Sequence, residues 1–145
     1  MAELRACLET AARGVDVAVC DPPPGLAGYL AHAELPFSRR LLQHIRDSGE
    51  SEVAVYKRAH VDRKLFSKIR SDPAYQPRKT TVAAFALALR LGPEQAAALL
   101  ESAGYSLSRS APFDLIVRFF LERRVYDILQ VNDALYEFGQ PLLNA

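Results

Sequence analysis

Apolar residues recur at three- and four-residue spacing through most of the chain after residue 37, with polar residues between them. This spacing is typical of helices that bury one face. Serine, threonine, aspartate, glycine and proline punctuate the pattern where helices would start and stop. No hairpin signal and no internal repeat interrupts it. The sequence therefore predicts an all-α fold, a compact bundle of about seven helices.

Individual capping residues set the predicted helix boundaries. Ser38 is the expected N-cap of the first helix in this series, and Gly49 is its expected end. Ser51 and Asp62 are expected to cap the second and third helices. The alanine-rich stretch "TVAAFALALRL" then predicts a largely apolar helix buried at the centre of the domain. Further helices are expected from Pro93, from Pro112 and around residues 131–138.

The domain organisation follows from a run of prolines. Pro22–Pro24 cannot continue a helix or pair within a central strand, so they predict a stiff extended linker. We therefore expect residues 1–24 to form an N-terminal arm, which either packs back on the domain or ends a longer protein. Residues 25–145 are expected to form one helical domain, with a core at about 37–104 and C-terminal helices at about 110–139.

Composition argues against several classes of protein. Half of the residues are hydrophobic and 24% are charged, as in soluble globular domains. The longest apolar run, Val82–Leu89, has eight residues, whereas a membrane span needs about 20. Cys7 and Cys20 lie at no zinc-site spacing and make no disulfide framework. Since the amino terminus also lacks a secretory signal, we expect a cytoplasmic protein with no membrane partner.

Candidate catalytic residues are scarce. The three histidines lie in unrelated segments, and none is at metal-ligand spacing. No nucleophile, phosphate-loop or dinucleotide-binding motif occurs in the sequence. Carboxylates such as Asp114 and Asp127 stand singly on amphipathic helices, where we expect them to be solvated or to cap a helix. The sequence therefore predicts no enzyme, no catalytic residue, no cofactor and no metal site.

Charge is distributed unevenly along the chain. The net charge is only +1, but the segment from Tyr56 to Lys79 holds eight basic and two acidic residues, a local net charge of +6. The rest of the chain then has ten basic and fifteen acidic residues, a net charge of −5. This segregation predicts one positive face on an acidic body, which favours an oriented encounter with a negatively charged partner.

The third predicted helix, "RKLFSKIRS", carries most of this charge on one side. Successive residues of a helix step by 100° around its axis, so Leu65, Phe66 and Ile69 share one sector and can face the core. The opposite side offers donors that bind phosphates or read guanine edges. The residues predicted to contact DNA from this helix are Arg63, Lys64, Ser67, Lys68 and Arg70.

Four flanking basic residues suit the DNA backbone. A basic side chain beside a recognition helix neutralises phosphates and positions the helix without reading sequence. For each of these residues alone, a role in surface solubility is an equal alternative. The predicted phosphate contacts are Lys57, Arg58, Arg78 and Lys79.

The segment "SEVAVYKRAHVDRKLFSKIRS" has a small residue in its first helix, an Ala59-x-Val61 turn, the Asp62 cap and the Ser67-x-Ile69 spacing. It resembles the helix-turn-helix of the lambda-repressor/Cro-like (XRE-type) family, and "ALALRLG" is similar to that family's fourth helix. The likeness covers about residues 37–104 and implies a central helix-turn-helix that binds DNA. The family usually has glycine where this chain has His60, so a left-handed backbone is expected there.

The sequence is also similar, through "VYKRAHVDRKLFSKIRSDPAYQPRKTTVAAFALAL" and its C-terminal helices, to a bacterial helical module. That module occurs alone or appended to other domains, including ADP-ribose-binding macro domains. The resemblance implies a bacterial accessory or regulatory role.

The sequence is compatible with two functions. The first is a helix-turn-helix protein that binds double-stranded DNA, either sequence-specifically or generally, and regulates transcription. The alternative is a protein–protein interaction module, an adaptor in signalling or defence, whose basic face docks on an acidic protein partner.

The C-terminal helices carry more apolar surface than one side of a helix can bury. These side chains either close the core or form a homodimer or hetero-partner interface. The residues predicted for such an interface are Phe113, Phe119, Phe120 and Tyr126.

Overall fold

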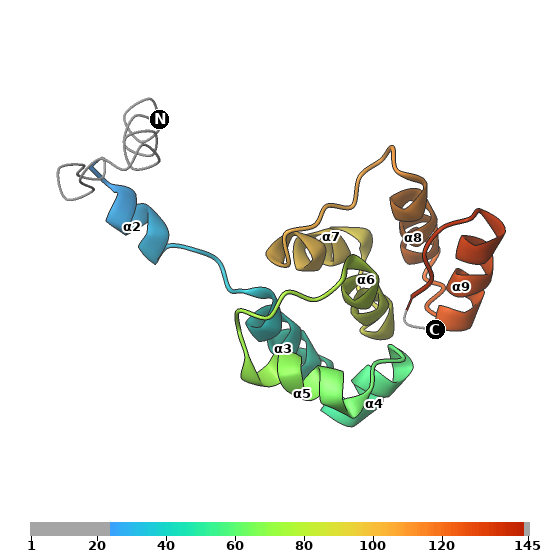
Figure 1. The fold of residues 1–145 in the computed structure, drawn as a ribbon, viewed down its shortest axis with the longest axis horizontal. Coiled ribbons are helices and arrows are strands. Elements are labelled where there is room, and N and C mark those ends of the chain that lie inside the picture. Colours follow the sequence, from blue (N-terminus) through green and yellow to red (C-terminus); the bar gives the residue numbers. More distant parts are fainter. Residues whose placement is uncertain (1–23, 144–145) are drawn as a thin grey trace, which may run out of the picture. The chain divides into compact units, whose positions relative to one another are not determined.

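The computed structural model describes residues 24–143, and every regular element in this range is an α-helix (Figure 1). The all-α prediction is therefore confirmed. The arm expected at residues 1–24 lies, except for Pro24, outside the described residues, as do both cysteines. The helices are α2 (Leu26–Ala31), α3 (Phe37–Ser48), α4 (Glu52–Arg58), α5 (Arg63–Ser71), α6 (Lys79–Ala88), α7 (Pro93–Ser102), α8 (Pro112–Glu122) and α9 (Ile128–Glu137).

The chain divides into two units between Glu34 and Leu35. Helix α2, which the sequence analysis did not predict, belongs to the first unit and buries none of its residues. The second unit runs from Leu35 and contains helices α3 to α9. The unit with the hydrophobic core thus begins at Leu35, whereas the sequence analysis set the start of the domain at residue 25.

Helix α6 forms the centre of the second unit. Residues Thr81–Ala88 are all buried, which confirms the prediction of a central apolar helix. Helices α4, α7 and α9 pack against it (Figure 1). Four of its residues are alanines, whose small side chains let neighbouring helices approach closely, while Phe85 fills the space between them.

Helices α3, α4 and α5 pack together through a few large apolar side chains. Helix α3 contacts α5 and α7, and α4 contacts both α5 and α6. The ring of Phe66 on α5 stacks on Tyr56 of α4, with 5.1 Å between their centroids. The same ring lies 6.2 Å from Phe85 of α6. Phe66 therefore anchors α5 to the core.

The predicted caps of α4 and α5 are confirmed. The Ser51 hydroxyl accepts a hydrogen bond from the Ala54 N–H at 3.1 Å, and the Asp62 carboxylate accepts one from the Leu65 N–H at 2.7 Å. The prediction for Ser38 is wrong. Helix α3 begins at Phe37, so Ser38 lies inside the first turn, where it is buried and caps nothing.

Helices α8 and α9 close the other end of the bundle. They pack on each other, and they also contact α7 and α6 respectively. The buried amide of Asn132 on α9 donates to the Leu143 carbonyl at 3.1 Å and accepts from the Leu143 N–H at 2.6 Å. This pair of bonds fixes the segment that follows α9. Helix α9 begins at Ile128, earlier than expected, because the Asp127 side chain caps it.

Three of the described helices are followed by a left-handed residue that is not glycine. His60, Arg90 and Arg124 follow α4, α6 and α8 with φ angles of 58°, 56° and 57°. In each case the next N–H bonds back to a carbonyl five residues earlier, as Val61 does to Tyr56 at 2.9 Å. The left-handed backbone expected at position 60 is therefore confirmed.

Replacing His60 by glycine should raise the free energy of unfolding by up to about 1 kcal/mol, because glycine adopts this backbone without strain. Urea denaturation of the wild-type chain and H60G measures the difference. Gly104→Ala is the matched opposite, since Gly104 has a φ of 84° and alanine should cost about 1 kcal/mol there. A destabilised H60G would contradict the assignment.

Candidate nucleic-acid interface

Helices α4 and α5 are joined by residues 59–62, and α5 carries its basic residues on the side away from the core. Phe66 and Ile69 are buried, and Leu65 is half-buried. The side of α5 that the helical periodicity assigned to the core is therefore the side that packs against the core. The five predicted DNA-contacting residues, Arg63, Lys64, Ser67, Lys68 and Arg70, are all exposed.

The exposed side of α5 is only partly free of intramolecular contacts. Arg63 and Lys64 form no ion pair with another residue of the range 24–143. The Lys68 ammonium lies 5.6 Å from the centroid of the Tyr75 ring. The Arg70 guanidinium donates to the Glu52 carboxylate at 3.0 Å. Glu52, in the first turn of α4, thus brings a negative charge to the edge of the basic side of α5.

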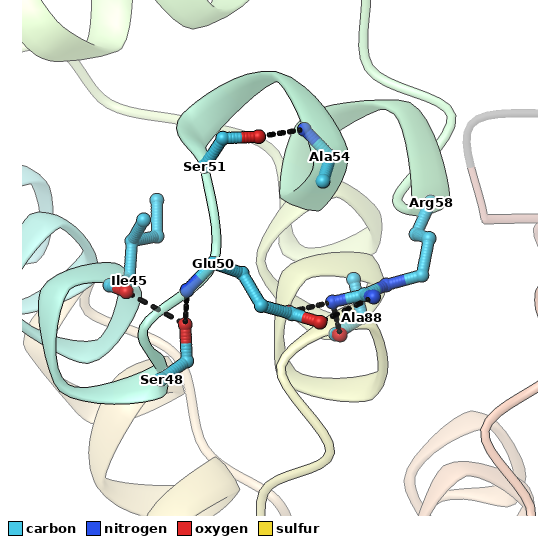
Figure 2. Close-up of polar contacts among 7 residues, drawn as sticks. All are labelled: Ile45, Ser48, Glu50, Ser51, Ala54, Arg58 and Ala88. Carbon is cyan, nitrogen blue, oxygen red and sulfur yellow. Dashed lines mark hydrogen bonds and ion pairs between the residues drawn. The ribbon is translucent and has the colours of Figure 1, made fainter.

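Arg58 ties three parts of the fold together, as Figure 2 shows. Its guanidinium makes a bidentate ion pair with the carboxylate of Glu50, on the connection between α3 and α4, with one bond of 2.9 Å. It also donates to the Ala88 carbonyl, at the end of α6, at 2.9 Å. The hydrogen bonds to Glu50 raise the pKa of Arg58, and the same bonds lower the pKa of Glu50. Arg58 is therefore held in an internal contact.

The connection that carries Glu50 is itself fixed by local hydrogen bonds (Figure 2). The Ser48 hydroxyl donates to the Ile45 carbonyl at 2.6 Å and accepts from the Glu50 N–H at 3.2 Å. Ser51 then caps α4 directly after it. Glu50 is therefore held in a defined position opposite Arg58.

Lys79 also has an intramolecular partner. Its ammonium lies 2.6 Å from a carboxylate oxygen of Asp114, which is 1% exposed. The other carboxylate oxygen accepts from the Ser108 N–H at 2.9 Å. The expectation that Asp114 is solvated or caps a helix is thus wrong, because the residue is buried where it links the start of α8 to the start of α6.

Lys57 and Arg78 remain the accessible members of the predicted phosphate set. Both are exposed, and neither forms an ion pair with a described residue. Sequence alone does not separate them from Arg58 and Lys79, because Glu50 and Asp114 reach those two cations only in the folded structure. The separation comes only from the tertiary contacts.

The four aromatic residues predicted for a partner interface do not form one surface. Phe119 and Phe120 lie together, with 5.4 Å between ring centroids, and both line an apolar groove between α8 and α9. Phe113 is half-buried, and its ring lies 5.7 Å from the Lys79 ammonium. Tyr126 lines a different hollow beside Arg58. Phe138, which the sequence analysis did not assign to an interface, completes the groove instead.

Comparison of the chain with models of known protein families, with curated proteins and with solved structures gives no match. Within residues 24–143, no three histidine, cysteine or acidic side chains gather as a metal site would require. In the same range, no helix combines the length and apolar composition needed to cross a bilayer.

Replacing Lys79 by methionine should lower the free energy of unfolding by roughly 1–3 kcal/mol, because it leaves the buried Asp114 carboxylate without its cation. Lys57→Met is the matched control and should change stability by less than about 0.5 kcal/mol. Urea denaturation at neutral pH measures both. Adding Asp114→Asn to the first variant should recover part of the loss, and no recovery would argue against the ion pair.

Proposed function

We propose that the protein binds double-stranded DNA through α5, with α4 and α5 acting as a helix-turn-helix. The observation that carries the proposal is the exposed side of α5, where five polar residues stand opposite the side chains that fix the helix to the core. A recognition helix needs this division, because it must be held rigidly while it presents donors to base edges. Transcriptional regulation in a bacterial cytoplasm is the role that the resemblance to XRE-type proteins supports.

The proposed contacts differ in kind along this surface. Arg63 and Lys64 have no ion-pair partner among the described residues, so their donors are available to guanine edges and phosphates. Ser67 lies between the basic residues, and its small side chain allows α5 to approach the major groove of DNA closely. Lys57 and Arg78 are exposed and suit flanking phosphates. Arg58 and Lys79 are not proposed as phosphate contacts, because their charges are largely offset by the paired carboxylates of Glu50 and Asp114.

Binding to random-sequence duplex DNA over a salt series tests the proposal. The logarithm of the association constant should fall linearly with the logarithm of salt concentration, by about 0.9 per phosphate contact. Lys57→Ala or Arg78→Ala should reduce that slope by about one contact, and Arg63→Ala should weaken binding at every salt concentration. Arg109→Ala, on the connection between α7 and α8, is the control and should change little.

The absence of binding at low salt, with correctly folded protein, would refute the DNA proposal. An unchanged slope in both Lys57→Ala and Arg78→Ala would refute the assignment of these two residues. Selection from a random duplex library then separates sequence-specific from general binding, because only the former enriches a motif.

Glu52→Gln should strengthen DNA binding several-fold at low salt. The substitution removes a negative charge beside the exposed side of α5 and releases the Arg70 guanidinium from its ion pair. The same duplex titration measures it. Glu101→Gln removes an exposed acid from α7 and serves as the control. Equal changes in DNA affinity for the two substitutions would show that binding depends on the net charge of the protein and not on the surface of α5.

A second candidate function is docking on an acidic protein in signalling or defence. The observation that favours it is that Arg58, Arg70 and Lys79 are already paired with acids, which leaves a basic surface of moderate strength. Such a surface suits a carboxylate-rich protein partner as well as a polyphosphate backbone. Retention on an acidic partner by a protein that fails to bind duplex DNA at low salt would support it.

A further inference from the structure

An apolar groove runs between α8 and α9 with a volume of about 320 Å³. Two of its residues are strongly exposed for phenylalanines, since Phe119 is 47% and Phe138 is 65% accessible. Among residues 24–143, the side chains that line it are all apolar. They are Leu115, Ile116, Phe119, Phe120, Ala134 and Phe138.

An exposed cluster of this kind differs from scattered surface hydrophobics. Single exposed apolar residues are normal on a soluble protein, but a contiguous apolar hollow with projecting aromatic side chains marks a surface that binds another molecule. The groove has a projecting ring and a hollow. Phe138 is the projecting ring at its edge, and Ile116 and Phe120 lie half-buried within it. A surface that offers a projecting ring and a hollow together can pair with a second copy of itself.

The charges beside the groove are arranged in the same self-complementary way. Helices α8 and α9 pack side by side (Figure 1) and are joined by the short connection 123–127, so they run as antiparallel neighbours. Arg123 directly follows α8, and Glu137 is the last residue of α9. They therefore lie towards opposite ends of the groove. Neither forms an ion pair with a described residue, and the Arg123 guanidinium covers the Phe119 ring at 3.7 Å.

We infer that the α8–α9 groove is the contact of a two-fold symmetric dimer, in which Phe138 of each copy enters the groove of the other. A two-fold axis through the middle of the groove exchanges its two ends. It therefore brings Arg123 of one copy to Glu137 of the other, twice. A basic end and an acidic end on one patch satisfy this symmetry, whereas two ends of like charge would not.

The inference does not rest on DNA binding. Helix α5 packs on α3 and α4, whereas α8 and α9 pack on α7 and α6. Dimerisation through the groove therefore uses a surface other than the exposed side of α5. Loss of the dimer and loss of DNA binding are separate outcomes, since substitutions in α5 leave the groove intact.

Sedimentation equilibrium of the wild-type chain should show a dimer at a chain concentration of about 100 μM. Phe138→Ser should make it a monomer while leaving the helical content unchanged, because this side chain is mostly exposed. Tyr136→Ser is the matched control, since Tyr136 is 78% exposed on α9 but does not line the groove. A monomeric wild-type chain, or a Phe138→Ser variant that dimerises as tightly, would overturn the inference.

A charge exchange tests the symmetry itself. Arg123→Glu and Glu137→Arg should each weaken dimerisation roughly tenfold or more, because each places like charges together at both ends. The double variant should dimerise as the wild type does. An equimolar mixture of the two single variants should form heterodimers, since each mixed pair joins opposite charges at both ends. If neither the double variant nor the mixture recovers the dimer, the proposed two-fold pairing is wrong.

Discussion

Burial of α6 is the constraint on which the rest of the structure depends. Because Thr81–Ala88 have no solvent-facing residue, other helices must cover this stretch on every side. Helices α4, α7 and α9 do so, and α5 joins them through the contact of Phe66 with Phe85. The orientation of the exposed side of α5 is therefore set by packing around a helix that carries none of the candidate contacts within its buried stretch.

Ion pairs decide how much of the positive charge is available to a partner. The segment with a local net charge of +6 contributes Arg58, Arg70 and Lys79 to ion pairs inside the fold. All three side chains hold helices together. Arg70 links α5 to α4, Lys79 links α6 to α8, and Arg58, besides its ion pair with Glu50, donates a hydrogen bond from the end of α4 to the end of α6. The basic character of the segment is thus partly structural, and the candidate interface is smaller than the charge count indicates.

The C-terminal helices combine a structural role with an incompletely buried surface. Val117, Leu121, Val131 and Leu135 are buried and complete the core. The opposite flank of the same helix pair leaves the α8–α9 groove open. Core closure, one of the two alternatives that the sequence left open, is thus provided by buried residues of these helices, while the proposed dimer contact would use their exposed ones. A helix has enough circumference to do both, since a core contact covers only part of it.

Local chemistry allowed the sequence to determine the helical class, the buried central helix and the caps at Ser51 and Asp62, because each depends on residues close together in the chain. Periodicity likewise assigned the two sides of α5. The left-handed turn at His60 was expected from the resemblance to XRE-type proteins. Only the tertiary structure decided which basic residues are paired and which aromatic residues meet, because those partners are brought together by packing. Glu52 and Arg70, for example, are 18 residues apart and become neighbours only once α4 and α5 are folded against the core.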